Sequence, residues 1–392
     1  MSARARGLIP RALAAVLLTA TTLLLAACGG DKADPARGSR DAAEGAARFP
    51  GWSTDFARRS VSLDEFQDGG PPRDGIPPID SPDVVTQGQG DRFLDEREPV
   101  MVVEQGGAAR AYPLQILVWH EIVNDSLAGR PIAVTYCPLC NSGVVFDRRL
   151  DGRELTFGTT GKLRRSDLVM WDRQTESWWQ QFSGEALVGA LTGKRLEQLA
   201  SQTLSWRDFK QIYPDGTVLS RDTGFDRDYG RNPYEGYEAD PNERPFALDG
   251  APDRRLPPKE RVVLIRSTGA ATVIPFSRLQ RHRVAAGRVG SQPYVVLFKR
   301  GVLSVLDAGT ITDSRDIGTA AAFDPRAGTR TLTFTPAAAG VFADQQTGST
   351  WDITGRAIRG PLAGERLRPL THDQQFWFAV AAFLPDATIA RR

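Results

Sequence analysis

Two cysteines, Cys137 and Cys140, lie two residues apart in the segment PIAVTYCPLCNSGVVFD (131–147). Thiols at this spacing bind a metal ion, take part in thiol–disulfide exchange or form a structural disulfide. The flanking residues read as strands, so the four residues of CPLC are predicted to form a tight turn. A β-turn brings its first and fourth Cα atoms within about 7 Å, which allows both a disulfide and a shared metal ion.

The two cysteines supply only two ligands, whereas a closed zinc site takes four. Among the three histidines, His120 is the best further ligand, because the helix expected to carry it leads into the strand of Cys137. We therefore predict a metal site of His120, Cys137 and Cys140 that binds copper or zinc, or that performs thiol redox chemistry. Two alternatives remain open. In the first, the cysteines are a structural pair in a binding or assembly module. In the second, His120 is a hydrogen-bonded core residue rather than a ligand.

A further set of cationic and tyrosine residues could bind a ligand. Its members are Arg164, Arg165, Arg221, Arg227, Tyr229, Arg231 and Tyr234. Such charges more often form a solvated face, and tyrosines equally well pack between two halves of a chain. The sequence lacks a complete phosphate loop, a second Asp-Thr-Gly and a Gly-x-Ser-x-Gly, so nucleotide binding, aspartic protease and esterase activities are not supported.

Composition restricts the partners only in part. The chain has 392 residues, of which 41% are hydrophobic and 24% are charged, and its net charge is +2. A balance this close to neutral gives no reason to expect a nucleic-acid partner. A small molecule or another protein remains the expected partner, with its identity open.

The N-terminus predicts export. Basic residues precede an apolar stretch over 12–27, and LAAC ends at Cys28 as in a bacterial lipobox. We predict a lipoprotein signal peptide over 1–27 and a lipidated Cys28 that anchors the protein to the membrane at its periplasmic face. Gly29 favours the outer membrane if the cell has one. A plain secretory signal and a signal anchor are the alternatives. The Gly- and Pro-rich residues 28–85 are predicted to form a flexible tether.

The remaining chain repeats itself. With small changes of offset, Pro275 aligns with Pro113 and His282 with His120, and DQQTGSTW (344–351) matches DRQTESWW (172–179). We predict repeat unit 1 over 86–221, a Tyr-, Gly- and Pro-rich inter-repeat segment over 222–256, and repeat unit 2 over 257–392. These ranges are called the leading half, the connecting segment and the trailing half below. The trailing half lacks the cysteines, with Lys299 and Val302 at the aligned positions.

Each half is predicted to carry the same elements. A strand, a turn and a helix opened by Pro113 (112–125) precede short strands at 132–136, 143–147, 154–158, 167–172 and 178–182, and a helix at 205–214 closes the unit. The expected fold class is therefore α+β and strand-dominated, with two similar antiparallel-sheet halves and peripheral helices.

Five segments together resemble the prokaryotic family named domain of unknown function 3179. They are YPLQILVWHEIVND, VTYCPLCNSGVVFDR, SDLVMWDRQTESWWQQFSGEA, LSRDTGFDRDYGRNPYEGY and LPPKERV. The resemblance runs from about Asp95 to the C-terminus and implies kinship rather than an activity. It implies that His120, Cys137, Pro138 and Asn141 are family features, as is the stretch 222–237. Because members of the family can carry another residue where Cys140 stands, the resemblance also favours Cys137 acting with His120.

Overall fold

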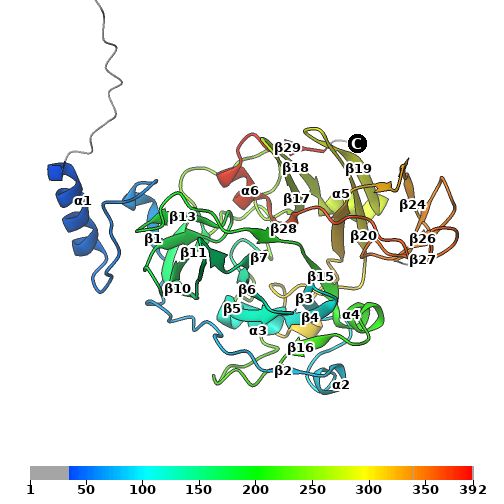
Figure 1. Cartoon of the computed structure of the whole chain (residues 1–392), viewed down its shortest axis with the longest axis horizontal. Helices are drawn as coiled ribbons and strands as arrows, with labels where there is room; N and C mark the ends of the chain where they lie inside the picture. Colours follow the sequence, from blue (N-terminus) through cyan, green and yellow to red (C-terminus); the bar gives the residue numbers. More distant parts are fainter. Residues whose placement is uncertain (1–34, 339, 391–392) are drawn as a thin grey trace, which may run out of the picture.

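The computed structural model describes residues 35–338 and 340–390, and Figure 1 shows its arrangement. Over these residues, strands far outnumber α-helices, and most strand pairs are antiparallel. The predicted class, α+β and strand-dominated, is confirmed. In Figure 1 the helix α1 (Pro35–Arg48) lies at one end of the molecule and the strands β24 to β27 lie at the other.

The leading half contains three main sheets. The first has the order β15-β3-β4-β16-β2, the second β14-β7-β6-β5, and the third β1-β10-β11-β12-β13, where β1 and β2 come from the preceding segment. The bounds are β1 (Phe66–Asp68), β2 (Val84–Val85), α2 (Gln87–Gly90), β3 (Pro99–Gln105), β4 (Ala108–Pro113), α3 (Leu114–His120), β5 (Ile122–Leu127), β6 (Arg130–Cys137), β7 (Ser142–Asp147), β8 (Arg149–Leu150), β9 (Arg153–Glu154), β10 (Phe157–Arg164), β11 (Asp167–Asp172), β12 (Trp178–Gln180), β13 (Glu185–Val188), β14 (Gln198–Leu199), β15 (Ser201–Ser205), α4 (Trp206–Ile212) and β16 (Thr217–Leu219).

The helix predicted over 112–125 is too long. Helix α3 begins after Pro113, as expected, but it ends at His120, and the following residues form β5. Glu121 ends the helix with φ +58°, a value that side-chain-bearing residues seldom adopt. The β-branched residues Ile122 and Val123 then pair with β6, so the segment divides between a short helix and a buried strand.

The trailing half repeats much of this order. Its elements are β17 (Arg261–Ser267), β18 (Ala270–Pro275), α5 (Phe276–His282), β19 (Val284–Val289), β20 (Gln292–Lys299), β21 (Thr319–Phe323), β22 (Arg326–Ala327), β23 (Arg330–Thr331), β24 (Phe334–Pro336), β25 (Phe342–Asp344), β26 (Thr350–Trp351), β27 (Ala357–Arg359), β28 (His372–Phe376), α6 (Trp377–Phe383) and β29 (Thr388–Ile389). Strand β29 pairs with β18 in parallel, as β16 pairs with β4.

Local details also recur at aligned positions. Pro275 precedes α5 as Pro113 precedes α3, and Arg283 ends α5 with φ +61°. The carboxylate of Asp172 accepts hydrogen bonds from the Thr175 amide and from Trp179 Nε1, and Asp344 makes the same bonds with its own neighbours. These features agree with the predicted duplication.

The segment before the leading half differs from the predicted flexible tether. Residues 28–34 and the Cys28 prediction lie outside the described part of the chain, but residues 49–85 pack against the fold. Phe49, Phe56 and Phe66 are buried around Trp178, with ring centroids 4.9 to 5.5 Å from that indole. Strand β1 also pairs with β10. The aromatic side chains bury enough apolar surface to hold a segment whose composition alone suggests a tether.

The two halves are joined by buried clusters to which both contribute. The largest buried cluster contains residues of β6 and β7 together with residues of β17 and α6. The backbone amide of Phe376 donates to the carbonyl of Cys140 over 2.8 Å, and Phe182 stacks on Phe383 at 4.5 Å between ring centroids. No helix in the described ranges has the length and hydropathy needed to cross a membrane.

Candidate metal centre

The cysteines occupy the tip of a buried hairpin. Strand β6 ends at Cys137 and β7 begins at Ser142, and the amide of Asn141 donates to the carbonyl of Pro138 over 3.1 Å. Asn141 has φ +50°, a conformation that asparagine tolerates better than most residues. The predicted tight turn is confirmed. Both cysteines are buried free thiols, so the structure does not contain the disulfide that a structural pair would form.

The third group beside the thiols is Asp167, which sequence analysis did not single out. One ligand atom each from Cys137, Cys140 and Asp167 lie within 4.8 Å of one another, and all three residues are buried. Asp167 begins β11, directly after a turn in which Arg165 and Ser166 both have positive φ. This turn directs the Ser166 carbonyl toward the hairpin tip, where Cys140 Sγ lies 3.4 Å from it.

The Asp167 carboxylate is held from one side only. Its Oδ2 accepts hydrogen bonds from Gln180 Nε2 at 2.5 Å and from the Phe182 amide at 2.9 Å. Its Oδ1 is buried and has no hydrogen-bond partner. Burial raises the pKa of Asp167 to about 6, although the two N–H donors favour the charged form. A buried carboxylate oxygen without a donor is costly unless another group, such as a cation, compensates it.

The thiols are protonated in the absence of a metal. Burial raises the pKa of Cys137, and it raises the pKa of Cys140 well above its usual value. Reactive cysteines have the opposite property, a lowered pKa and partial exposure. The pair therefore lacks the environment of a nucleophilic or redox-active thiolate.

Glu121 is a second buried acid close to this group. Burial, with a smaller effect from the charge of Asp167, raises the pKa of Glu121 to about 8, although the hydrogen bond from the Tyr234 phenol lowers it. Glu121 reaches the site because it lies directly after the last residue of the helix, where its φ of +58° turns the chain.

His120 is not part of this group, which corrects the predicted His/Cys site. Its Nδ1 lies 2.7 Å from the Pro77 carbonyl and its Nε2 lies 2.5 Å from the Tyr229 hydroxyl. Burial lowers the pKa of His120, so the neutral ring donates from Nδ1 and accepts at Nε2. The hydroxyl of Tyr229 also bonds to Thr223. His120 thus joins α3 to two loop segments, and both of its nitrogens are in use.

Comparison with known families agrees with the resemblance seen in the sequence. A family described as a protein of unknown function (DUF3179) matches residues 73–387. The chain belongs to the DUF3179 family. No curated protein and no solved structure matches it. The matched range begins before the leading half, so residues 73–85 of the packed segment, including Pro77, belong to the family domain.

In this DUF3179 protein the residues predicted to bind a ligand do not converge on one point. Arg164 contacts Glu65 and Gln180, and Arg165 contacts the Ala382 carbonyl. The other five residues are spread over several places. Arg221 bonds to Gln115, Arg231 bonds to Thr310, Arg227 and Tyr229 lie near His120, and Tyr234 lies near Glu121. Tyr234 is therefore close to the cysteine group, and Arg164 is linked to it through Gln180, which donates to Asp167.

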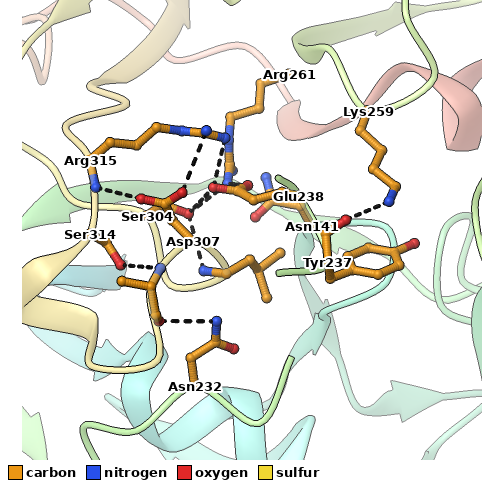
Figure 2. A network of polar contacts seen from close by, with 12 residues as sticks. Asn141, Asn232, Tyr237, Glu238, Lys259, Arg261, Ser304, Asp307, Ser314 and Arg315 are labelled. Carbon is orange, nitrogen blue, oxygen red and sulfur yellow. Dashed lines mark hydrogen bonds and ion pairs between the residues drawn. The ribbon is translucent and has the colours of Figure 1, made fainter. Parts of the chain in front are cut away.

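A polar network fixes the connecting segment over the cysteine hairpin, and Figure 2 shows it. Arg261 and Arg315 pair with the buried Glu238, and Ser304 donates to its Oε1 over 2.7 Å. Lys259 donates to the Tyr237 carbonyl. The hydroxyl of Tyr237 in turn donates to the Leu139 carbonyl, between the two cysteines, over 3.0 Å. The trailing half thus helps to hold the turn that carries the thiols.

Proposed function

We propose that this DUF3179 protein binds a zinc ion through Cys137, Cys140 and Asp167. The observation that carries the proposal is the buried Oδ1 of Asp167, which lacks a partner and belongs to a group of three donor atoms within 4.8 Å. Two thiols and a carboxylate in this arrangement supply three ligands of a tetrahedral ion and leave a fourth position for water or another donor.

The donor types favour zinc over copper. Thiolates suit both zinc and copper(I), but a carboxylate is a hard ligand that zinc accepts more readily than copper(I) does. The ion also compensates the buried charge of Asp167 and replaces the protons of the two thiols. Copper remains an outcome that metal analysis would detect.

Thiol redox chemistry is the less favoured function of the same hairpin. The raised pKa values of both cysteines and their complete burial oppose attack on a disulfide. A purely structural role leaves the buried Oδ1 of Asp167 with no donor other than the two thiols beside it. Metal binding accounts for the thiols and the carboxylate together.

The proposed setting is the periplasmic face of a membrane, with the protein anchored through a lipid on Cys28. The lipobox LAAC and the preceding apolar stretch support this setting. Labelling the full-length chain with a radioactive fatty acid tests it. Cys28→Ser should abolish the label and release the protein from membranes, and unchanged labelling would contradict the anchor.

Metal analysis of the full-length chain, purified without chelators, tests the metal site. We expect about one equivalent of zinc, and we expect Cys137→Ser, Cys140→Ser and Asp167→Asn to lose most of it. Substitution by cobalt(II) should give thiolate-to-metal charge-transfer bands that disappear in the cysteine variants. Asp172→Asn is the matched control, because Asp172 is a buried aspartate on the same strand whose oxygens are already bonded. The proposal fails if the folded wild type binds no zinc, or if Asp172→Asn and Asp167→Asn lose it equally.

A further inference from the structure

A cavity of about 380 Å³ lies beside the cysteine hairpin. Its wall comes from segments far apart in the sequence. Leu139 belongs to the hairpin tip, Ile76 to the packed N-terminal segment, and Tyr234, Tyr237 and Phe246 to the connecting segment. Glu121 completes the wall on the side of the candidate metal centre. The cavity therefore lies where the packed N-terminal segment, the leading half and the connecting segment meet.

Most polar atoms on this wall already have partners. The hydroxyl of Thr159 donates to the Ile76 carbonyl over 2.8 Å, and the hydroxyl of Tyr237 donates to Leu139. Lys162 Nζ lies 3.2 Å from an Asp68 carboxylate oxygen. The remaining polar position is the carboxyl of Glu121 with the phenol of Tyr234 beside it. A ligand in this cavity therefore meets an apolar surface with a single polar site.

We propose that the cavity binds a small, uncharged and largely apolar molecule whose one hydrogen-bonding group faces Glu121 and Tyr234. An apolar cavity of about 150 Å³ holds benzene, so this volume suits a molecule on the order of 12 to 16 non-hydrogen atoms. Lys162 on the wall opposes a cationic ligand, and because it is already paired with Asp68, the charge of an anionic ligand would be buried without a partner.

Phe246 marks the entrance. It lines the cavity and yet is 54% exposed, which is unusual for a phenylalanine in the described residues. An apolar ring at the rim lets an apolar ligand leave water before it reaches the tyrosines. The site goes beyond the proposed zinc centre and does not require the ion, although its ligand would contact Leu139 between the two cysteines.

Titration of the full-length protein with 2-naphthol tests the proposal. This molecule is bicyclic, uncharged at neutral pH and carries one hydroxyl group. We expect saturable binding at one site, and binding weaker by on the order of tenfold for naphthalene-2-sulfonate and for 2-naphthylmethylammonium. The absence of saturable 2-naphthol binding overturns the proposal, as does a charged analogue that binds equally well.

Two variants locate the binding. Ile76→Trp fills the cavity from a half-buried loop position and should weaken 2-naphthol binding by on the order of tenfold or more. Ile358→Trp, at a half-exposed position on β27, is the matched control and should bind as the wild type does. Phe246→Ala changes only the exposed rim and should weaken binding several-fold, which keeps the test available if Ile76→Trp does not fold. Wild-type affinity in both Ile76→Trp and Phe246→Ala overturns the proposal.

The zinc content of the same samples separates this inference from the proposed function. If the cavity is wrong and the metal site is right, the protein contains zinc but does not bind 2-naphthol. If the metal site is wrong, zinc is absent while 2-naphthol binding and its dependence on Ile76 persist.

Discussion

The buried Glu121 should make the stability of the metal-free protein depend on pH. In the folded chain its pKa is raised to about 8, mainly by burial, whereas the ordinary value is 4.5. The folded-state value is the higher one, so the stabilising contribution is fully present below about pH 4.5 and is lost as the pH rises through 8. Between about pH 5.5 and 7.5 the unfolded chain has released this proton and the folded chain has kept it. One proton over two pH units corresponds to about 2.7 kcal/mol of unfolding free energy.

Replacing Glu121 by Gln removes this dependence with little change of shape. Urea unfolding of both chains in excess chelator, followed by fluorescence at about pH 5.5 and 7.5, gives the four free energies. We expect the wild type to lose about 2 to 3 kcal/mol more than Glu121→Gln between the two pH values. Infrared difference spectra should also contain a protonated-carboxyl band at pH 7 that Glu121→Gln lacks. The reasoning is refuted if both chains lose the same stability, because Glu121 would then be ionised in the folded protein.

Two other substitutions test the corrections to the sequence predictions. His120→Ala should retain zinc but lose about 2 to 4 kcal/mol of unfolding free energy, because the Pro77 carbonyl and the Tyr229 hydroxyl lose their partner. Metal analysis together with thermal unfolding checks this. Loss of zinc with unchanged stability would contradict it. Trp178→Ala should lose about 3 to 5 kcal/mol of unfolding free energy and expose the segment around Phe49 to limited proteolysis, because that indole is the centre of the docked aromatic cluster. Cleavage at the wild-type rate would mean that other contacts hold the segment.

The strands and turns could be predicted from the sequence because their signals are local. A short apolar run, Gly-Gly at 106–107 and the Pro before α3 define β3, the turn to β4 and the start of the helix. The end of α3 could not be predicted this way. No Gly or Pro marks Glu121, and its left-handed backbone is imposed by the pairing of β5 with β6, which is a tertiary effect.

The N-terminal segment shows a different limit. Its Gly- and Pro-rich composition indicates little regular structure, yet α1 occupies Pro35–Arg48, and the packing of the remainder depends on a few large side chains rather than on average composition. Phe49, Trp52, Phe56 and Phe66 recur in this segment and bury their rings on the third sheet of the leading half. Aromatic residues in a region otherwise typical of a linker were the available signal for docking.

Of the candidate site, the two cysteines could be predicted from the sequence, but the third ligand could not. The hairpin that carries Cys137 and Cys140 follows from local sequence, but the third ligand depends on which strands come together in space. His120 is nearer in sequence, and a ring in an apolar helix resembles a ligand as much as a core residue. Asp167 begins the strand DLVMWD, whose middle four residues are apolar. Acidic residues are seldom buried, so an aspartate at the start of such a strand was an available signal for a functional group.

The trailing half has other contacts at the positions that align with the two cysteines. At the position aligned with Cys137 it has Lys299, whose ammonium reaches the buried Asp208 of the leading half over 2.6 Å. Val302, aligned with Cys140, is buried without a polar contact to make. The same half supplies the Phe376 amide that holds the Cys140 carbonyl and, through Lys259, the contact that holds Tyr237 over Leu139. In the proposed zinc site the leading half presents the ligands while the trailing half anchors the turn that carries them, so we expect a substitution in β28 to disturb zinc binding without touching a ligand.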